Sequence, residues 1–182
     1  MVCFRNYRER LMKNIFLIGL PSSGKTTLGK QLARHARYRF VDTDVLIVKE
    51  EGMPIPDIFA QKGEPYFREA EARILRAIRP DSKLVIATGG GMPCFHENID
   101  YIKANGISVF LDVSPEQIVE RILRHSSDDR PLYQKNDNQL LDNLREKHQS
   151  RLSFYNQADF ILQGDNITIR QLIDAIQPAL VS

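Results

Sequence analysis

Short apolar runs alternate along the chain with longer segments of helical period. The runs are rich in β-branched or aromatic residues and lie at 15–18, 39–41, 84–87, 107–111 and 159–162. Apolar residues that recur every three or four positions predict helices over 25–36, 64–79, 115–125, 138–155 and 169–176. Because alternating strands and helices form βαβ units, the pattern predicts an α/β fold with a mostly parallel sheet of five strands.

Two segments fall outside this alternation. Residues 126–138 are dense in Ser, Asp, Asn and Lys around a lone Arg130-Pro131, which predicts an exposed, mobile lid loop. Residues 1–12 precede the first strand, and we expect them to be an extension of a single domain that occupies the 182-residue chain. The helix after residue 114 has a marked start, with Ser114 as its cap, Pro115 in its first position and Gln117 placed to bond back to the cap.

A phosphate-binding motif follows the first apolar run. Residues 19–26 match G-x-x-x-x-G-K-[ST] between a predicted strand and a predicted helix. The glycines let successive backbone N–H groups face an anion, and the helix N-terminus adds partial positive charge. We expect Lys25 to reach the β- and γ-phosphates of a nucleotide such as ATP, and the Thr26 hydroxyl to bind Mg²⁺. The predicted nucleotide-binding residues are Gly19, Leu20, Pro21, Ser22, Ser23, Gly24, Lys25, Thr26 and Thr27.

A nucleotide site of this kind could serve a kinase, a GTPase switch, an ATP-driven machine or a regulatory binder. No [NT]-K-x-D tetrapeptide, which reads guanine in small GTPases, occurs in the sequence, and 182 residues are few for a mechanical ATPase. The residues after the other strands must therefore decide between the remaining classes.

Two aspartates follow the second apolar run. Asp42 and Asp44 lie at its carboxyl end, where open α/β sheets bind their ligands. In a phosphotransferase, one carboxylate would hold Mg²⁺ and the other would accept the proton of the acceptor hydroxyl. The alternative is that an aspartate caps a helix that begins near Thr43.

Arginines and glycines add candidates for an acceptor site. Glu71 follows Arg68 by one helical turn and could orient its guanidinium, whose two-pronged hydrogen bonding suits an anionic acceptor. Arg151 could join Arg68 around a carboxylate, and Arg130 could neutralise charge on the transferred phosphate. The glycines at 89–91 would let the backbone approach a ligand closely. Taken singly, each arginine is more often a solvated charge, and three glycines can form a flexible turn.

Composition excludes several other classes of protein. A net charge of +2 gives no broad attraction to nucleic acid or to an anionic membrane, and no apolar run approaches the ~20 residues that span a bilayer. Cys3 and Cys94 form no CxxC pattern, and the four histidines have no metal-ligand spacing. We therefore expect a cytoplasmic monomer with small-molecule partners only.

Taken together, these motifs resemble those of shikimate kinases, and the likeness covers the chain from about residue 14 onward. The matching residues are Gly19 to Thr26, Asp42 and Asp44, Phe67-Arg68 with Glu71, Gly89-Gly90-Gly91, Arg130-Pro131-Leu132, and Arg151 ahead of Tyr155. One departure is Ser22, where the family usually carries glycine. Ser22 would need a backbone conformation that is unusual for a residue with a side chain, or a slightly different phosphate cradle.

The resemblance implies a P-loop fold of the nucleoside-monophosphate-kinase type, a three-layer α/β/α domain with parallel strands in the order 2-3-1-4-5 and a mobile lid. It implies that ATP phosphorylates the 3-hydroxyl of shikimate, giving ADP and shikimate 3-phosphate, in the pathway to chorismate and the aromatic amino acids. Shikimate would contact Asp44, Arg68, Gly89, Gly90, Gly91 and Arg151. Thr26 and Asp42 would organise Mg²⁺, and Lys25, Asp44 and Arg130 would be catalytic, with Arg130 touching the nucleotide phosphates.

Two rival interpretations remain. Gluconate and adenylylsulfate kinases have similar phosphate loops, but they carry D-G-D after the second strand, whereas this chain has D-T-D together with a triple glycine and two well-placed arginines. A nucleotide-dependent regulator without catalysis would lack acceptor or magnesium groups, yet Lys25, Thr26, Asp42 and Asp44 are all present.

Overall fold

The structure is a computed structural model that describes residues 13–126 and 137–181. The predicted extension at 1–12 and nearly all of the predicted lid, with Arg130, lie outside these residues. The elements, in chain order, are β1 (Asn14–Ile18), α2 (Lys25–Ala36), β2 (Arg39–Asp42), α3 (Thr43–Glu51), α4 (Ile55–Ala77), β3 (Leu84–Ala87), the 3₁₀ turn η1 (Met92–Cys94), α5 (Asn98–Asn105), β4 (Gly106–Asp112), α6 (Pro115–Ser126), α7 (Asp137–Tyr155), β5 (Phe160–Gln163) and α8 (Ile169–Val181).

Five parallel strands form one sheet in the order β2-β3-β1-β4-β5, which confirms the fold that the sequence resemblance implies. The central strand, β1, is flanked by β3 and β4, with Ile15 paired to Val85 on one side and to Ile107 on the other. All residues of β1 and β3 are buried, as expected for parallel strands that are covered on both faces. Because both faces of these strands are buried, their sequences are continuously apolar.

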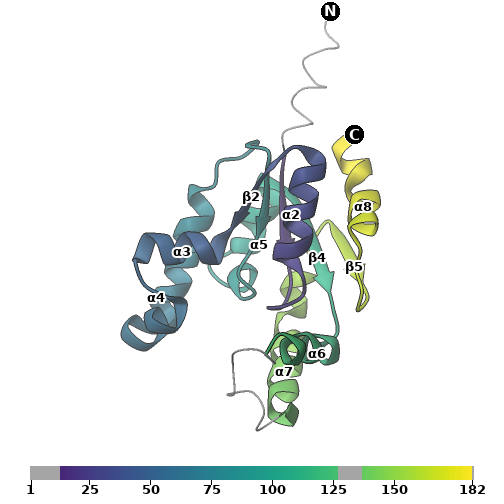
Figure 1. Cartoon of the computed structure of the whole chain (residues 1–182). Helices are drawn as coiled ribbons and strands as arrows, with labels where there is room; N and C mark the ends of the chain where they lie inside the picture. The colour runs from purple at the N-terminus through teal and green to yellow at the C-terminus, as the bar shows by residue number, and fades with distance from the viewer. Residues whose placement is uncertain (1–12, 127–136, 182) are drawn as a thin grey trace, which may run out of the picture.

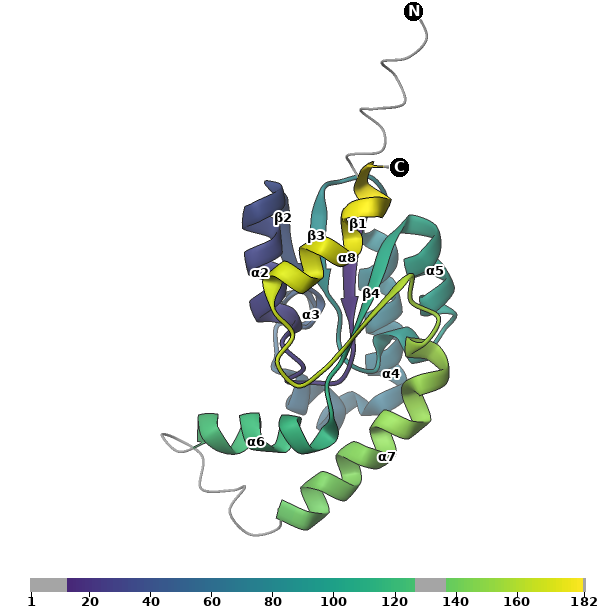
Figure 2. The same ribbon diagram turned by 90° about the vertical axis from the view of Figure 1, so that its right-hand side faces the viewer.

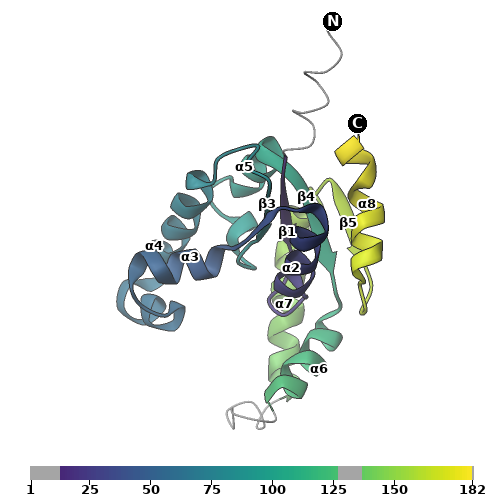
Figure 3. The ribbon, with the colours of Figure 1, turned by 45° about the horizontal axis from the view of Figure 1, so that its top comes forward.

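Helices cover both faces of the sheet (Figures 1 and 2). Ile15 and Leu17 of β1 pack toward α2 and α8, in a cluster that includes Leu32 and Leu172. The alternate residues of β1 pack toward α4, α5, α6 and α7 in a second cluster. Helices α3 and α4 pack mainly on each other around a third, smaller cluster and lie beside the β2 edge of the sheet (Figure 3).

Helix α5 was not expected from the sequence, and α3 was foreseen only in the alternative that an aspartate caps a helix near Thr43. One further helix begins earlier than expected. Helix α3 has no helical period because its apolar residues are consecutive, and α5 has only eight residues. Helix α4 begins at Ile55 rather than at residue 64, with a kink at Gly63, where φ is 81°, followed by Pro65. The proline ring and the left-handed glycine break the hydrogen-bond ladder, which explains why the period is clear only after the kink.

The predicted start of α6 is confirmed in part. The Ser114 hydroxyl accepts a 3.2 Å hydrogen bond from the N–H of Gln117, as a cap does. The side chain of Gln117 does not bond back to the cap, however, because it donates to Glu120 instead. The N–H and hydroxyl of Ser114 are bonded to the Asp165 carboxylate. Among the described residues, no helix is long and apolar enough to cross a membrane.

Candidate active site

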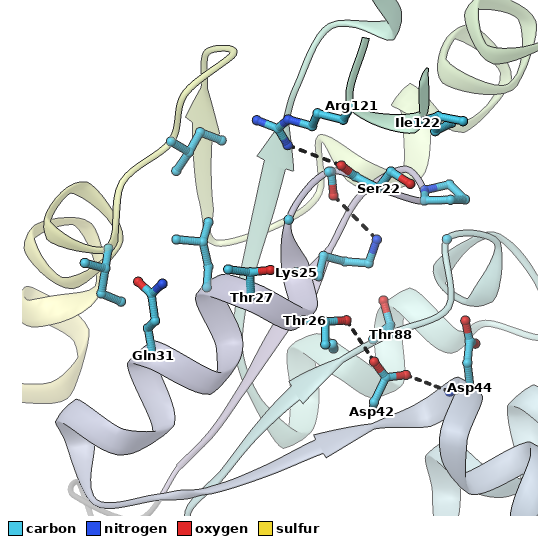
Figure 4. Close-up of a pocket in the computed structure, with 18 of the residues that line it drawn as sticks. Ser22, Lys25, Thr26, Thr27, Gln31, Asp42, Asp44, Thr88, Arg121 and Ile122 are labelled. Atoms are coloured by element: carbon cyan, nitrogen blue, oxygen red, sulfur yellow. Dashed lines mark hydrogen bonds between the residues drawn. The ribbon is translucent and has the colours of Figure 1, made fainter. Parts of the chain in front are cut away.

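The phosphate-binding loop joins the end of β1 to the start of α2 (Figure 4). Gly19 and Gly24 have φ values of 139° and 101°, which residues with side chains rarely adopt. A Cβ on Gly19 would lie 2.8 Å from the Leu111 carbonyl oxygen of β4, so the loop passes directly over the sheet. Ser22 has φ 61°, the left-handed conformation that the comparison with glycine-containing loops predicts.

Lys25 is folded back into the loop that precedes it. Its Nζ donates to the carbonyl oxygens of Gly19 at 2.9 Å and Leu20 at 2.6 Å, and to the Ser23 hydroxyl at 3.5 Å. These contacts match the three N–H donors of an ammonium group. Burial lowers the pKa of Lys25 to about 8, although Asp44 and Asp42 act in the opposite direction. Within the described part of the chain, the Lys25 ammonium is hydrogen-bonded to neutral oxygens, from which it can turn toward an entering phosphate.

Asp42 accepts two hydrogen bonds, one of which is the helix cap that the sequence offered as an alternative. Its Oδ2 accepts a 2.9 Å hydrogen bond from the Thr26 hydroxyl, and its Oδ1 accepts a 3.1 Å bond from the N–H of Asp44. The second bond caps helix α3, while the first brings the carboxylate to the beginning of α2. Thr26 and Asp42 thus present oxygen atoms side by side at the phosphate loop, and oxygen is the ligand atom that Mg²⁺ prefers.

Asp44 lies at the meeting point of the two halves of the site. Its side chain lines the same cavity as the phosphate loop (Figure 4). The buried Oδ1 has no hydrogen-bond partner among the described residues. Burial raises the pKa of Asp44, and the charge of Asp42 raises it further, whereas Lys25 and Arg68 lower it. A buried, unpartnered carboxylate oxygen is costly unless a ligand completes it, so Asp44 has the properties of a group that awaits a hydroxyl donor.

Arg68 is held by two glutamates of its own helix. Its Nε and Nη2 donate to Glu64 Oε1 at 3.0 and 2.6 Å, and its Nη1 donates to Glu71 Oε2 at 2.7 Å. The predicted pair with Glu71 is therefore present. Burial raises the pKa of Glu71 to about 7, even though Arg68 lowers it. Only 10% of the Arg68 side chain is exposed, so the guanidinium is a buried group rather than a solvated surface charge.

The triple glycine is packed too closely to carry any side chain. A Cβ would lie 2.7 Å from Oδ1 of Asp44 at Gly89, 2.7 Å from Cδ of Pro21 at Gly90, and 2.4 Å from Nη1 of Arg68 at Gly91. The backbone N–H of Gly89 donates a 2.9 Å hydrogen bond to the Thr43 hydroxyl. The glycines therefore form a fixed, close-packed segment between the phosphate loop and Arg68, not a flexible turn.

Helix α7 contributes Arg151 and Tyr155, one turn apart. The Tyr155 hydroxyl donates to the Gly90 carbonyl oxygen, and its ring lies 4.8 Å from that of Phe110. Burial raises the pKa values of Glu71 and Tyr155 and lowers the pKa of Lys25, and the charge of Arg151 acts to lower all three, which places its guanidinium in the same electrostatic environment as both halves of the site. The helix after the predicted lid thus ends against the glycine segment.

The principal cavity has a volume of about 1280 Å³. Among the predicted site residues, it is lined by Pro21, Ser22, Ser23, Gly24, Lys25, Thr26, Thr27, Asp42, Asp44 and Gly90. Gly19 and Leu20 lie beneath it as acceptors for Lys25. Arg68, Gly89, Gly91 and Arg151 do not line it. Gly89 packs against Asp44 and Glu71, and Gly91 packs against Arg68, which is bonded to Glu71. Arg130 lies outside the described residues.

Sequence reasoning missed several residues that line this cavity, which include Gln31, Thr88, Arg121, Ile122, Ile167, Thr168 and Ile169. Arg121 Nη1 donates a 3.2 Å hydrogen bond to the Ser22 carbonyl (Figure 4). Its Nη2 donates to the Asp165 carbonyl. The signal for residues 167–169 was their place after the fifth strand, at the sheet edge where ligands bind. Arg121 had only a weaker signal, since it follows the buried Ile118 by one helical turn.

Known proteins share this arrangement. The family model described as shikimate kinase matches residues 21–180. A shikimate kinase of Clostridium botulinum is 41% identical over 155 residues, which cover 85% of this chain and 89% of the relative. The crystal structure of a shikimate kinase from Bacteroides thetaiotaomicron aligns with TM-score 0.79 and 36% identity over 92% of this chain and 94% of that one. A shikimate kinase from Acinetobacter baumannii in complex with shikimate aligns with TM-score 0.75 and 33% identity over 90% and 89%. The chain therefore belongs to the shikimate kinase family.

Proposed function

We propose that the protein transfers the γ-phosphoryl group of ATP to the 3-hydroxyl of shikimate, releasing ADP and shikimate 3-phosphate. The observation that carries this proposal is the position of Asp44. Its carboxylate lines the cavity of the phosphate loop, and its unpartnered Oδ1 lies against the glycine segment that packs on Arg68. Asp44 therefore faces the site of the phosphate donor and also lies next to the segment that packs on the Arg68 guanidinium, which is suited to an anionic acceptor.

The acceptor is oriented by its carboxylate. Among the described residues, Glu64 and Glu71 take three of the five N–H donors of Arg68, one on Nε and one on each terminal nitrogen. One donor on each terminal nitrogen is left for the two oxygens of a substrate carboxylate. Arg151 supplies the second positive charge. The ring hydroxyls of shikimate then point toward Asp44 and the backbone of Gly89 to Gly91.

Asp44 acts as the proton acceptor. As the 3-hydroxyl oxygen forms its bond to the γ-phosphorus, its proton passes to the Asp44 carboxylate, and the bond between the γ-phosphorus and the β,γ-bridging oxygen breaks. The Lys25 ammonium exchanges its hydrogen bonds to the loop carbonyls for bonds to the β- and γ-phosphates, where it stabilises their negative charge. We assign Arg130 to the transferred phosphate on the resemblance alone.

Thr26 and Asp42 are suited to hold Mg²⁺. They place a hydroxyl and a carboxylate 2.9 Å apart at the phosphate loop, and Mg²⁺ is commonly bound by one or two such groups together with nucleotide phosphates and water. When bound, the ion neutralises phosphate charge and orients the β- and γ-phosphates.

We further propose that the protein acts as a cytoplasmic monomer on small molecules alone. Every group assigned above comes from a single chain, so the site needs no second subunit. The net charge of +2 provides no broad attraction to nucleic acid or to an anionic membrane.

A coupled assay of ADP release tests the function, with shikimate, gluconate and adenylylsulfate offered in parallel with Mg·ATP. We expect turnover with shikimate only, because the acceptor side presents arginines and a carboxylate base in place of the motif of the rival kinases. Turnover with gluconate or adenylylsulfate alone would identify a different kinase. ATP binding without turnover on any of the three acceptors would favour the regulatory interpretation.

A further inference from the structure

Phe95 lies over the guanidinium of Arg68. The Cζ of Arg68 is 4.3 Å from the centroid of the Phe95 ring, a shorter distance than the 5.4 Å to its chain neighbour Phe67. A cation at this distance is attracted by the negative face of the ring, and the attraction is strongest where water is excluded. Because 90% of the Arg68 side chain is buried, the contact is of the stronger kind.

The backbone that carries Phe95 is fixed on both sides. Before it, Cys94 N–H donates to the Gly91 carbonyl at 3.0 Å, which ties the turn η1 to the glycine segment. After it, Asn98 N–H donates to the Phe95 carbonyl at 3.0 Å, and the Asn98 side chain is fully buried and bonds to Met92 O. Phe95 is therefore held in place, although 38% of it is exposed.

The backbone is strained at the two residues that follow Phe95. His96 and Glu97 have φ values of 50° and 55°, two successive left-handed residues that are not glycine. Such conformations cost free energy and persist only where the surroundings enforce them. Here Arg76 donates to the carbonyl of His96 at 2.6 Å and to Asn98 Oδ1 at 2.7 Å, which holds the reversed chain against α4.

We infer that Phe95 is a positioning residue for the acceptor carboxylate, which acts by fixing the plane of the Arg68 guanidinium. Glu64 and Glu71 hold the edges of this group, but hydrogen bonds at the edges still allow it to tilt. A ring over the face removes this freedom and keeps water from that face. Since a carboxylate pairs with arginine in the plane of the guanidinium, a fixed plane sets the orientation of the bound acid.

This inference rests on the proposed function, and its test separates the two. We would compare Phe95→Leu and Phe95→Met, which keep apolar bulk without a ring, with Phe95→Tyr, which keeps the ring. Steady-state kinetics would be measured for shikimate and for ATP, and thermal unfolding would verify that each variant folds. Ile161→Ala is the matched control, because Ile161 is a similarly exposed apolar residue, at 41%, on the distant strand β5.

We expect KM for shikimate to rise roughly three- to thirtyfold in Phe95→Leu and Phe95→Met, the range that corresponds to a partly or fully desolvated cation–π contact. KM for ATP should stay within twofold, and Phe95→Tyr and Ile161→Ala should resemble the wild type. Absence of shikimate turnover in the wild type would refute the function itself. Normal turnover with an unchanged KM for shikimate in the folded leucine and methionine variants would refute the role of Phe95 alone.

A double-mutant cycle with Arg68→Lys tests whether Phe95 acts through the arginine. If it does, Phe95→Leu should change KM for shikimate less than twofold when residue 68 is lysine, because an ammonium has no plane to fix. An equal effect in both backgrounds would show that the ring contacts the substrate directly, and would overturn the positioning role.

Discussion

Thr26 donates a 2.9 Å hydrogen bond to Asp42 and thereby joins the first turn of α2 to the end of strand β2. The two residues come from different predicted motifs, and β2 is separated from β1 by β3 in the sheet. The bond forms because both side chains project at the carboxyl edge of the sheet. It sets the separation between the phosphate loop and the aspartates of the acceptor side.

Removal of the Thr26 hydroxyl should weaken the use of magnesium. In Thr26→Val, we expect the Mg²⁺ concentration that gives half-maximal turnover to rise roughly tenfold, the usual scale for the loss of a supporting metal contact. Thr26→Ser keeps the hydroxyl and should restore the wild-type value. A magnesium titration at saturating ATP and shikimate measures this concentration in both variants and in the wild type. EDTA should abolish turnover in all three proteins, and a chelator-resistant activity would contradict the assignment.

Asp44→Asn should retain ATP binding while turnover collapses. The amide keeps the shape of the side chain but cannot accept a proton, and the loss of a general base typically costs 10²- to 10⁴-fold in rate. Calorimetric titration of Mg·ATP and steady-state kcat provide the two readouts. Asp57→Asn, at an exposed position in the first turn of α4, is the control. A kcat within threefold of wild type would remove Asp44 from the chemical step.

Arg68→Lys should affect the acceptor more than the nucleotide. A lysine keeps the charge but cannot offer two coplanar donors, so we expect KM for shikimate to rise by about tenfold or more while KM for ATP changes little. Arg73→Lys is the matched control, since Arg73 lies on the same helix and pairs instead with Glu50 and Glu51. A change confined to KM for ATP would place Arg68 on the wrong side of the site.

The lowered pKa of Lys25 predicts opposite effects of pH on activity and stability. Its pKa of about 8 in the folded protein lies below the ordinary value of 10.5 for an unperturbed lysine. Above pH 8 Lys25 loses its proton in the free enzyme, so kcat/KM for ATP should fall there. In the enzyme with bound nucleotide, the phosphates favour the ammonium, so the fall in kcat should occur at a higher pH. Between pH 8 and 10.5 the unfolded chain binds more protons, so the Lys25 contribution to stability rises with pH.

Thermal unfolding of Lys25→Met over the same pH range isolates this contribution. The variant should lack the part of the stability change that the wild type gains between pH 8 and 10.5. Identical pH dependences of stability in the two proteins, or a wild-type kcat/KM for ATP that is constant up to pH 9.5, would contradict the prediction.

Ser22→Gly should stabilise the protein. A residue with a side chain in the left-handed region costs about 1–2 kcal/mol relative to glycine, partly offset by the greater freedom of glycine in the unfolded chain. We expect a gain of about 1 kcal/mol, which corresponds to ~2–4 °C in Tm for a chain of this size. Ser150→Gly, at an exposed position inside α7, should instead destabilise by ~0.5 kcal/mol. Equal effects at the two positions would show that φ at Ser22 is not the cause.

The sheet could be predicted because buried parallel strands are continuously apolar. The phosphate loop could be predicted because glycines and a lysine at this spacing, between a strand and a helix, are typical of phosphate binding. Helix α3 could not be predicted from periodicity, because its helical state depends on the cap from Asp42 and on burial of Ile47 against α4, and neither leaves a periodic signal. The structure confirms the cap from Asp42 and shows that its second oxygen accepts a hydrogen bond from Thr26, so the cap leaves the proposed magnesium role open to the same carboxylate.

Contacts between residues that are distant in the chain could not be predicted from the sequence. Arg121 reaches Ser22 across 99 positions of the chain, and Tyr155 reaches Gly90 across 65. No local pattern encodes such pairs, because the approach of α6 and α7 to the loops is set by packing against the sheet. The Phe95 contact with Arg68 is of the same kind: an aromatic residue in a short turn has no periodicity that would assign it a partner.

The two glutamates that hold Arg68 also decide which anions can reach it. Because burial raises the pKa of Glu71 to about 7, the net charge of Glu64, Arg68 and Glu71 near neutral pH lies between zero and one negative charge, so chloride or inorganic phosphate meets no bare cation there. Only a ligand whose oxygens fit the two remaining donors gains enough to overcome this internal repulsion. We therefore expect this cluster to favour a carboxylate that fits both donors over the more abundant small anions of the cell, without excluding them by size.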